Sequence, residues 1–373
     1  MEENAAELTT VQLWNGPAPR ATGSGPEDVP ILTVCPAPAE TATGAGVVLC
    51  PGGGFNVLVT DREGLHVAQW FNEIGVTVFM LRYRLRTDGY DPAVALVDGK
   101  RAVRYVRHHA AEYGVSPDRI GMSGFSAGSR LSSWVALTAD DGDAEADDPI
   151  ERESCRPDFL VLAYAPVGGR GGNGLEGVTK DFPPTFLFHT QRDQAVGSDG
   201  AWELFKALRD AGVNAEFHLF GGYGPHGVGL AAGHPTAGRW PELAHGWLRD
   251  AGLLTGARRA AVRGTVTIDG EPMPWGGWVT LVPEDAATAP IAAAMVTTAE
   301  GGFTIDAEHG PVPGPHRVEV RMVPRKLHTD GSPWRDTILL TKAAPDAADD
   351  MTFVVKGAHN TLNIDIRTDG GAE

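Results

Sequence analysis

Short apolar runs alternate with helix-patterned segments over the first two thirds of the chain, and this alternation restricts the fold more than any other feature. Several of the runs are continuously apolar, as at residues 47–49, which is typical of strands buried on both faces of a parallel sheet. We expect strands near residues 31–34, 46–50, 76–81, 120–122, 159–163, 185–188 and 215–220, with helices between them. This order predicts an α/β fold with a doubly wound sheet, whose functional site lies beyond the carboxyl ends of the strands.

The pattern changes near residues 255–262, where helical periodicity stops. About seven short alternating runs follow, separated by turn pairs such as Asp269-Gly270. These runs predict a small all-β sandwich over residues 260–368. Residues 1–30 are rich in Pro, Gly and Thr and are expected to form an irregular N-terminal arm. The α/β domain is therefore expected to cover residues 31–255.

Charge and cysteine spacing exclude several classes of function. A net charge of −17 over 373 residues argues against binding to nucleic acid or to anionic membrane surfaces, which need clustered basic side chains. No apolar stretch approaches the ~20 residues of a membrane span. Neither the three cysteines (Cys35, Cys50, Cys155) nor the histidines have the spacing of a zinc site, so no metal and no cofactor are expected. The acidic run at residues 140–148 is interpreted as a solvated loop.

The sequence leaves localisation and assembly open. Its first residues are acidic and have neither the basic region nor the apolar region of a signal peptide, so the chain as written is not expected to be exported. A chain trimmed of its signal peptide would look the same, which keeps a secreted or periplasmic location open. No feature of the sequence indicates an oligomeric state.

The most informative stretch for function is the segment at residues 118–131. A short apolar run leads into Gly124-Phe-Ser126-Ala-Gly128, and a helical pattern follows. Strand, Gly-x-Ser-x-Gly and helix in this order form the context of a nucleophile elbow, in which glycines allow a turn sharp enough to expose the serine hydroxyl. In a chain with 48 glycines the five-residue pattern alone is not specific, and a glycine-rich turn is the alternative. The prediction that Ser126 is a nucleophile therefore depends on its partners.

A serine nucleophile needs a base and an acid that orients the base, and in this architecture they follow in the order serine, acid, histidine. Asp193 comes after the candidate strand at 185–188, and His226 comes after the candidate strand at 215–220. Both are expected at the sheet edge where Ser126 stands. The alternatives are Asp199 as the acid, which looks like the start of the next helix, and His234 as the base, which lies in a later loop.

The first strong strand ends in Pro51-Gly-Gly-Gly-Phe55, where donors for an oxyanion are expected. Backbone N–H groups of Gly53 and Gly54, with that of Ala127, could bind a developing negative charge on a substrate oxygen. The alternative is a phosphate-binding loop, but the segment has neither the GxGxxG nor the GK[ST] pattern of such loops. We also consider Phe55, Arg130 and Tyr223 as substrate-binding side chains, with a place in the hydrophobic core as the alternative for the aromatic residues.

Several stretches taken together resemble the acetyl esterases and acetylxylan esterases of the α/β-hydrolase lipase/esterase group, which also includes feruloyl-type enzymes. The resemblance covers about residues 30–252 and rests on Leu49-Cys-Pro-Gly-Gly-Gly-Phe55, Phe79-Met-Leu-Arg-Tyr-Arg84, Ser116-Pro-Asp-Arg-Ile120, Gly124-Phe-Ser-Ala-Gly128, Arg156-Pro-Asp-Phe159, Asp193 with Val196, and His226-Gly-Val-Gly229. It implies that the family's serine, acid and histidine fall on Ser126, Asp193 and His226. The family more often has Gly-His at the position of Ser129-Arg130, a departure that bears on substrate preference.

The C-terminal part resembles transthyretin-like or carboxypeptidase-regulatory-like β-sandwiches, on Gly264-Thr-Val-Thr-Ile-Asp-Gly270, Gly302-Phe303 and Val312-Pro-Gly314. Taken together, these features predict a serine esterase that removes short acyl groups, chiefly acetyl, from small esters or from oligosaccharides such as acetylated xylan. A general short-chain carboxylesterase or a feruloyl-type esterase is the nearest alternative. A peptidase of the prolyl-oligopeptidase kind and an inactive hydrolase that serves as a binding protein stay open as other classes of function.

Overall fold

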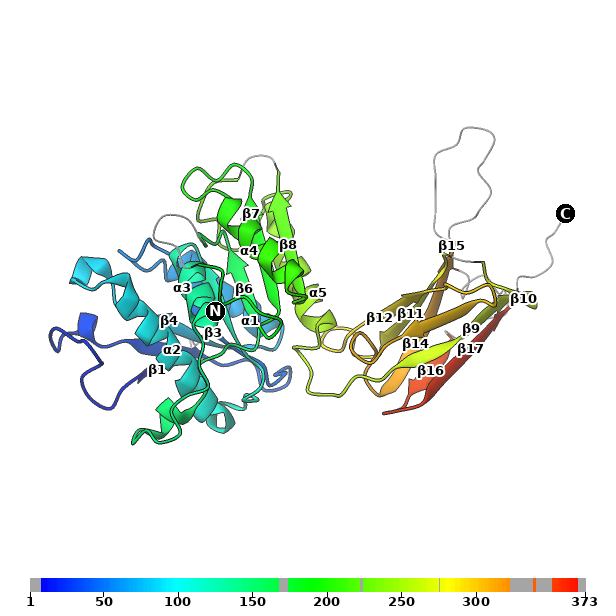
Figure 1. Cartoon of the computed structure of the whole chain (residues 1–373), viewed down its shortest axis with the longest axis horizontal. Helices are drawn as coiled ribbons and strands as arrows, with labels where there is room; N and C mark the ends of the chain where they lie inside the picture. Colours follow the sequence, from blue (N-terminus) through cyan, green and yellow to red (C-terminus); the bar gives the residue numbers. More distant parts are fainter. Residues whose placement is uncertain are drawn as a thin grey trace, which may run out of the picture. The chain divides into compact units, whose positions relative to one another are not determined.

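The computed structural model describes residues 8–167, 174–221, 224–274, 276–322, 338–339 and 351–367 of the 373-residue chain. The chain forms two compact units that divide between Trp247 and Leu248, and each is described here by itself. Figure 1 marks the elements along the chain. No helix in the described ranges combines the length and the apolar character that a membrane span requires.

The first unit is built around one sheet, whose described strands follow the order β1-β2-β4-β3-β5-β6-β7-β8. Their bounds are Thr9–Gln12 (β1), Ile31–Cys35 (β2), Gly46–Cys50 (β3), Thr77–Arg82 (β4), Ile120–Phe125 (β5), Leu160–Ala163 (β6), Thr185–Thr190 (β7) and Ala215–Phe220 (β8). All pairs from β4 to β8 are parallel, whereas β1 and β2 add antiparallel strands at one edge. The chain enters this parallel part at β3 and extends it in both directions, so the doubly wound α/β prediction is confirmed.

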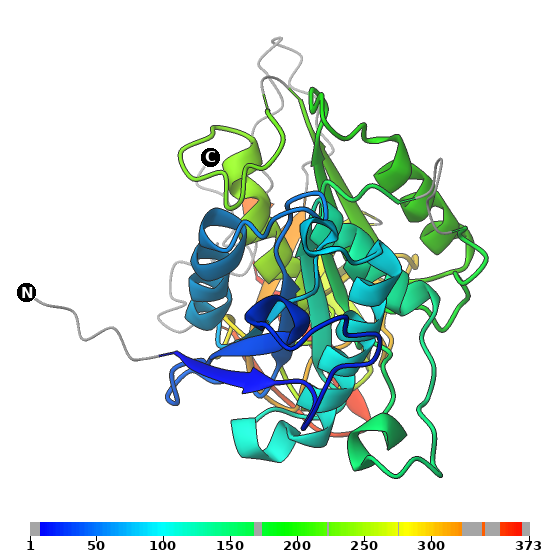
Figure 2. The ribbon, with the colours of Figure 1, turned by 90° about the vertical axis from the view of Figure 1, so that its left-hand side faces the viewer.

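Helices cover both faces of the sheet because its strands are apolar on both faces. They are His66–Glu73 (α1), Pro92–His108 (α2), Ala127–Leu137 (α3), Asp199–Asp210 (α4) and Trp240–Asp250 (α5). Side chains of α2, α3 and α4 share one buried core with alternate strand residues, among them Leu131, Leu204, Val48, Met122 and Leu187. On the other face Trp70 of α1 contacts Trp240 of α5, whose ring stacks on Phe188 of β7 at 4.5 Å. Figure 2 shows α1 (blue) and α5 (yellow-green) on the side of the sheet opposite α4 (green).

The N-terminal segment is more regular than the sequence predicts. Residues 1–30 were expected to be an irregular arm, but β1 pairs antiparallel with β2, from Thr9 opposite Val34 to Gln12 opposite Ile31. Leu13, which follows β1, is 1% exposed, and its carbonyl accepts a hydrogen bond of 2.7 Å from Nε of the α2 residue Arg101. The prediction was wrong at Thr9–Gln12, because a four-residue edge strand with one strongly apolar residue has no periodicity to detect. Residues 13–25 contain neither helix nor strand, as expected.

Two sheets form the second unit. One contains Val262–Ile268 (β9), Glu271–Pro272 (β10), Gly302–Ile305 (β13) and Asn360–Ile366 (β17), and the other contains Trp278–Pro283 (β11), Ala292–Met295 (β12), Gly314–Met322 (β14), Ile338–Leu339 (β15) and Thr352–Val355 (β16). Inward-facing residues of both sheets, such as Val266 and Val320, form a single core. Two sheets that share a core make a β-sandwich, so the all-β prediction for this part is confirmed.

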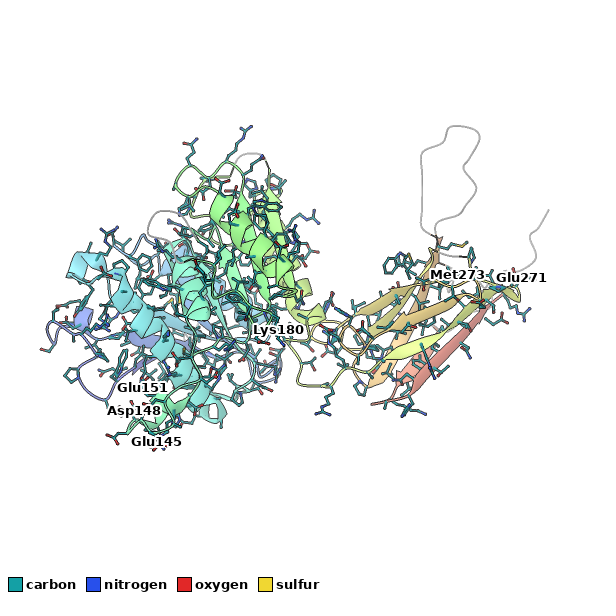
Figure 3. All side chains as sticks on the ribbon, in the orientation of Figure 1. Glu145, Asp148, Glu151, Lys180, Glu271 and Met273 are labelled. Atoms are coloured by element: carbon teal, nitrogen blue, oxygen red, sulfur yellow. The ribbon has the colours of Figure 1, made fainter. Side chains whose placement is uncertain are left out.

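The acidic run after α3 is held by arginines of α2. Arg101, whose side chain is 2% exposed, contacts carboxylate oxygens of Asp148 at 2.6 Å and Glu151 at 2.8 Å, and Arg104 pairs with Asp140. Figure 3 labels Asp148 and Glu151, which lie together at the edge of the first unit. Among the described residues no cluster of acidic, histidine or cysteine side chains could hold a metal ion. The carboxylates therefore neutralise α2 side chains as well as meeting solvent.

Candidate active site

Ser126 occupies the turn between β5 and α3. Its backbone angles are φ 54° and ψ −117°, a combination that costs energy for any residue other than glycine. Strain of this kind persists where the surrounding structure fixes the turn, and it is common at functional sites. Only 8% of the Ser126 surface is exposed.

The two glycines of the Gly-x-Ser-x-Gly motif are required by close backbone contacts. A Cβ atom at Gly124 would overlap the backbone of Gly128 and Ser129, and a Cβ atom at Gly128 would overlap the carbonyl of Cys50 at the end of β3. The start of α3 is thus packed directly against two neighbouring strands. Any larger residue would push Ser126 away from the carboxyl edge of the sheet.

Three of the predicted residues form a continuous hydrogen-bonded chain. The Nε2 atom of His226 lies 2.8 Å from Oγ of Ser126, and its Nδ1 atom lies 2.6 Å from Oδ2 of Asp193. The other carboxylate oxygen of Asp193 accepts hydrogen bonds of 2.9 Å from the N–H groups of Ala195 and Val196. The Asp193 side chain is 1% exposed and that of His226 is 26% exposed. A buried, doubly anchored carboxylate can hold the imidazole ring in one orientation while its far nitrogen reaches the serine.

The alternative acid and base have other places. Asp199 is the first residue of α4, is exposed, and follows the helix cap at Ser198. The Nδ1 atom of His234 accepts hydrogen bonds from the N–H groups of Thr236 at 3.3 Å and Ala237 at 3.1 Å, at the turn before α5. His234 is thus engaged with the backbone of the turn before α5, whereas Asp199 occupies the exposed first position of α4.

The glycine loop after β3 lies against the serine. Gly53 and Gly54 have φ values of +133° and +66°, which favour glycine. A Cβ atom on the preceding Gly52 would lie 3.1 Å from Cβ of Ser126, which shows how closely the loop approaches this serine. Within the described residues, the N–H groups of Gly53, Gly54 and Ala127 donate to no protein acceptor. Ala127 is also the first residue of α3, where helix N–H groups are unpaired and the positive end of the helix dipole lies.

The three side chains predicted to bind substrate differ in their surroundings. Phe55 is 6% exposed and its ring packs 5.8 Å from that of Tyr83 in the core, which favours packing over substrate contact. Arg130 lies in the first turn of α3, and its Nε atom is buried without a hydrogen bond among the described residues. Tyr223 lies outside the described residues.

Two further residues adjoin this site and were not predicted from the sequence. Glu63, just before α1, is 2% exposed and contacts both Gly52 and Tyr164 through hydrogen bonds. Tyr164 follows β6, and its ring meets the imidazole of His226 edge to face with 4.8 Å between centroids. Burial and the negative charge of Glu63 raise the pKa of the Tyr164 phenol well above its ordinary value. The place of Tyr164 at a strand end was a usable signal, whereas nothing in the sequence distinguishes Glu63.

Comparison with known proteins supports the same architecture. The BD-FAE family matches residues 34–166. The acetylxylan esterase of Xylanibacter ruminicola is 33% identical over 125 residues, which cover 34% of this chain and 23% of that protein. Endo-1,4-beta-xylanase B of Butyrivibrio fibrisolvens is 29% identical over 210 residues, 50% of this chain and 32% of that protein. The chain thus spans less than a third of the length of these two curated relatives.

One solved structure is matched by this chain over almost the whole length of that structure. The acetyl ester-xyloside bifunctional hydrolase of Caldicellulosiruptor lactoaceticus is 32% identical and superposes with a TM-score of 0.59. The match covers 97% of that protein and 66% of this chain.

Proposed function

We propose that the first unit of this chain, which belongs to the family of α/β-hydrolase esterases, hydrolyses short-chain carboxylic esters. The proposed catalytic residues are Ser126, His226 and Asp193. The main support is the hydrogen-bonded chain from Asp193 through His226 to the strained Ser126, next to a glycine loop whose Gly53 and Gly54 N–H groups donate to no acceptor among the described residues. We propose that the catalytic domain covers residues 31–255, with β1 as an added edge strand of its sheet, and that the β-sandwich covers residues 260–368.

In the first half of the reaction Ser126 Oγ attacks the ester carbonyl carbon, and its proton passes to Nε2 of His226. The carbonyl π electrons move onto oxygen, which gives a tetrahedral oxyanion. Collapse of this intermediate re-forms the carbonyl and breaks the bond to the alcohol oxygen, which takes the proton back from His226. The products of this half are the free alcohol and an acyl group on Ser126.

In the second half water attacks the acyl carbon, and His226 removes a proton from the water. The new tetrahedral intermediate collapses to carboxylic acid, and the proton held by His226 returns to Ser126 Oγ. Asp193 accepts the hydrogen bond from Nδ1 of His226 in both halves and stabilises the imidazolium without taking its proton. The sum is ester plus water to acid plus alcohol, with no cofactor required.

The N–H groups of Gly53, Gly54 and Ala127 are proposed to stabilise the oxyanion. They belong to a loop and a helix start that border Ser126, and none has a protein acceptor in the described ranges. Loss of one such donor in other acyl-transfer enzymes slows turnover by about 10²–10³-fold. Fixed donors of this kind need no reorganisation when the charge appears, so they favour the transition state over the ester.

We propose acetyl groups on a carbohydrate such as acetylated xylan as the substrate. Support comes from relatives named acetylxylan esterase and acetyl ester-xyloside bifunctional hydrolase. The test is acetate release from acetylated xylo-oligosaccharides by the wild type and by Ser126→Ala, with p-nitrophenyl acetate as a second substrate. Release by the wild type alone is expected. Cleavage of p-nitrophenyl acetate without release from the oligosaccharides would overturn the carbohydrate assignment and leave a general esterase.

Two further substrates separate the other classes of function. A peptidase would release a chromophore from a blocked peptide, and a feruloyl-type esterase would release ferulate from its methyl ester. A binding protein with an inactive hydrolase fold would act on none of these substrates. We expect acetyl ester cleavage to exceed the other two rates.

A further inference from the structure

We propose that Glu63 is a positioning residue that joins the glycine loop to the histidine side of the site. This inference rests on the proposed esterase function. Glu63 lies in a single π-helical turn, Asp61–Leu65, which leads into α1. Its side chain points inward and is shielded from solvent. Its two carboxylate oxygens contact two different parts of the site.

One carboxylate oxygen holds the glycine loop. Oε2 of Glu63 accepts a hydrogen bond of 3.0 Å from the N–H of Gly52, and this bond is buried. Gly52 is enclosed, because an added Cβ atom would overlap Glu63 Oε2 and lie 3.1 Å from Cβ of Ser126. Glu63 therefore fixes the peptide directly before Gly53 and Gly54, the two proposed oxyanion donors of this loop. The hydroxyl of Tyr83 supports the same loop by donating to the carbonyl of Pro51 at 2.7 Å.

The other carboxylate oxygen binds Tyr164, whose ring packs against the imidazole of His226. The hydroxyl of Tyr164 donates to Oε1 of Glu63 at 2.7 Å in a buried hydrogen bond. Tyr164 is fully buried, has the unusual φ of 39°, and places its ring edge to face against His226. The bond to Glu63 thus holds the phenol in the position where its ring packs against His226.

The neighbouring residue adds a third connection. Arg62 Nε donates to the carbonyl of Gly227, the residue after His226, at 3.0 Å. A Cβ atom on Gly227 would lie 3.5 Å from Oε1 of Glu63, so the carboxylate also approaches the backbone of the histidine loop. No ion pair of Glu63 with a basic side chain occurs within the described ranges, so its contacts are directed at the site itself.

The consequence is a coupling of two groups that must be aligned together. The oxyanion donors and His226 act on the same tetrahedral intermediate, and displacement by about 1 Å can cost about 10²-fold in rate. Because one carboxylate contacts both sides, its removal should disturb both at once. The effect should appear in the chemical step more than in substrate binding.

The experiment measures how fast a fluorophosphonate probe labels Ser126, because labelling needs the serine, the histidine and the oxyanion donors but no particular natural substrate. The variants are Glu63→Ala, Glu63→Gln, Tyr164→Phe and the double variant Glu63→Ala/Tyr164→Phe. Glu73→Gln, on the exposed end of α1, is the matched control. Thermal unfolding of each variant and the separate kcat and KM for p-nitrophenyl acetate complete the comparison.

We expect Glu63→Ala to lower the labelling rate and kcat at least tenfold with KM changed less than threefold. Glu63→Gln should retain most of the rate, because its amide can accept from Gly52 and donate to the Tyr164 oxygen. Tyr164→Phe should lower the rate severalfold alone and have little effect in the Glu63→Ala background. If Glu63→Ala fails to fold, the labelling rates of Glu63→Gln and Tyr164→Phe are compared instead. A wild-type labelling rate for Tyr164→Phe then overturns the proposal.

Other outcomes are also decisive. A wild-type labelling rate in folded Glu63→Ala overturns the positioning role and leaves the esterase proposal intact. Additive effects of the Ala and Phe replacements overturn the coupling. A wild-type protein that the probe does not label at Ser126 overturns the proposed function, and the positioning role with it.

Discussion

Replacement of Asp193 by Asn is expected to trap His226 in the wrong tautomer. Oδ1 of Asp193 accepts from two backbone N–H groups, so an Asn must keep its carbonyl oxygen at this position. Its NH₂ group then occupies the place of Oδ2 and points at Nδ1 of His226, 2.6 Å away in the wild type. Nδ1 must become the acceptor, and the ring proton moves to Nε2. A protonated Nε2 cannot take the proton of Ser126, although every heavy atom stays in place.

The expected loss is large. The same replacement in a serine protease lowers kcat about 10⁴-fold. At about 1.4 kcal/mol per factor of ten, this corresponds to about 5 kcal/mol of lost transition-state stabilisation. KM should change little, because the Asp193 side chain is 1% exposed and lies on the side of the imidazole away from Ser126.

The assay is kcat for p-nitrophenyl acetate at neutral pH. The matched control is Asp199→Asn, which changes an exposed carboxylate six residues further on, at the first position of α4, and should stay within about twofold of the wild type because it touches no group of the site. A loss of less than tenfold in a folded Asp193→Asn would refute the tautomer reasoning. An equal loss in both variants would mean that the effect is not specific to Asp193.

Two further predictions concern stability. The side chain of Arg84 is 1% exposed and lies 2.6 Å from the Asp98 carboxylate, so Asp98→Ala leaves a buried guanidinium without its partner. The free energy of unfolding in denaturant should therefore fall by about 3–5 kcal/mol. A fall below about 1 kcal/mol would contradict this. Partial burial raises the pKa of Asp140, but Lys100 and Arg104 outweigh it and lower the pKa to about 2 from 3.8. Because the folded pKa lies below the unfolded one, this stabilisation is present above pH 3.8 and is lost as the pH falls through 2. At neutral pH the free energy of unfolding of Asp140→Asn should therefore be about 1 kcal/mol lower than that of the wild type, since solvent exposure of the pair weakens the effect. The difference should vanish in acid, and a pH-independent difference would contradict this explanation.

The sequence was sufficient for elements with a strong pattern. The continuous apolar run 46–50 became the central strand β3, and the alternating runs of the C-terminal part became strands of a sandwich. Ser126, Asp193 and His226 could be placed on loops at one sheet edge from strand order alone, and these loops do meet in the structure. Their catalytic roles stay a prediction, as do the domain boundaries.

Other features depend on contacts that no local pattern encodes. The partners of Glu63 are 11 and 101 residues away, so the carboxylate looks like an ordinary charged residue before α1 in the sequence. Phe55 follows the glycine loop and could face a substrate in a linear reading, but its side chain turns into the core beside Tyr83. Strand β1 has too few apolar residues to show a period, and its position follows from pairing with β2.

The central claim is that Ser126 is the nucleophile of an esterase. It is tested most directly by mass spectrometry of the wild type and of Ser126→Ala after reaction with a fluorophosphonate probe. We expect one adduct per wild-type chain, on the peptide that contains Ser126, with loss of p-nitrophenyl acetate cleavage in proportion to labelling. Ser126→Ala should carry no adduct and keep its fold. An adduct on another residue, or an unlabelled wild type that still cleaves the ester, would show that Ser126 is not the nucleophile.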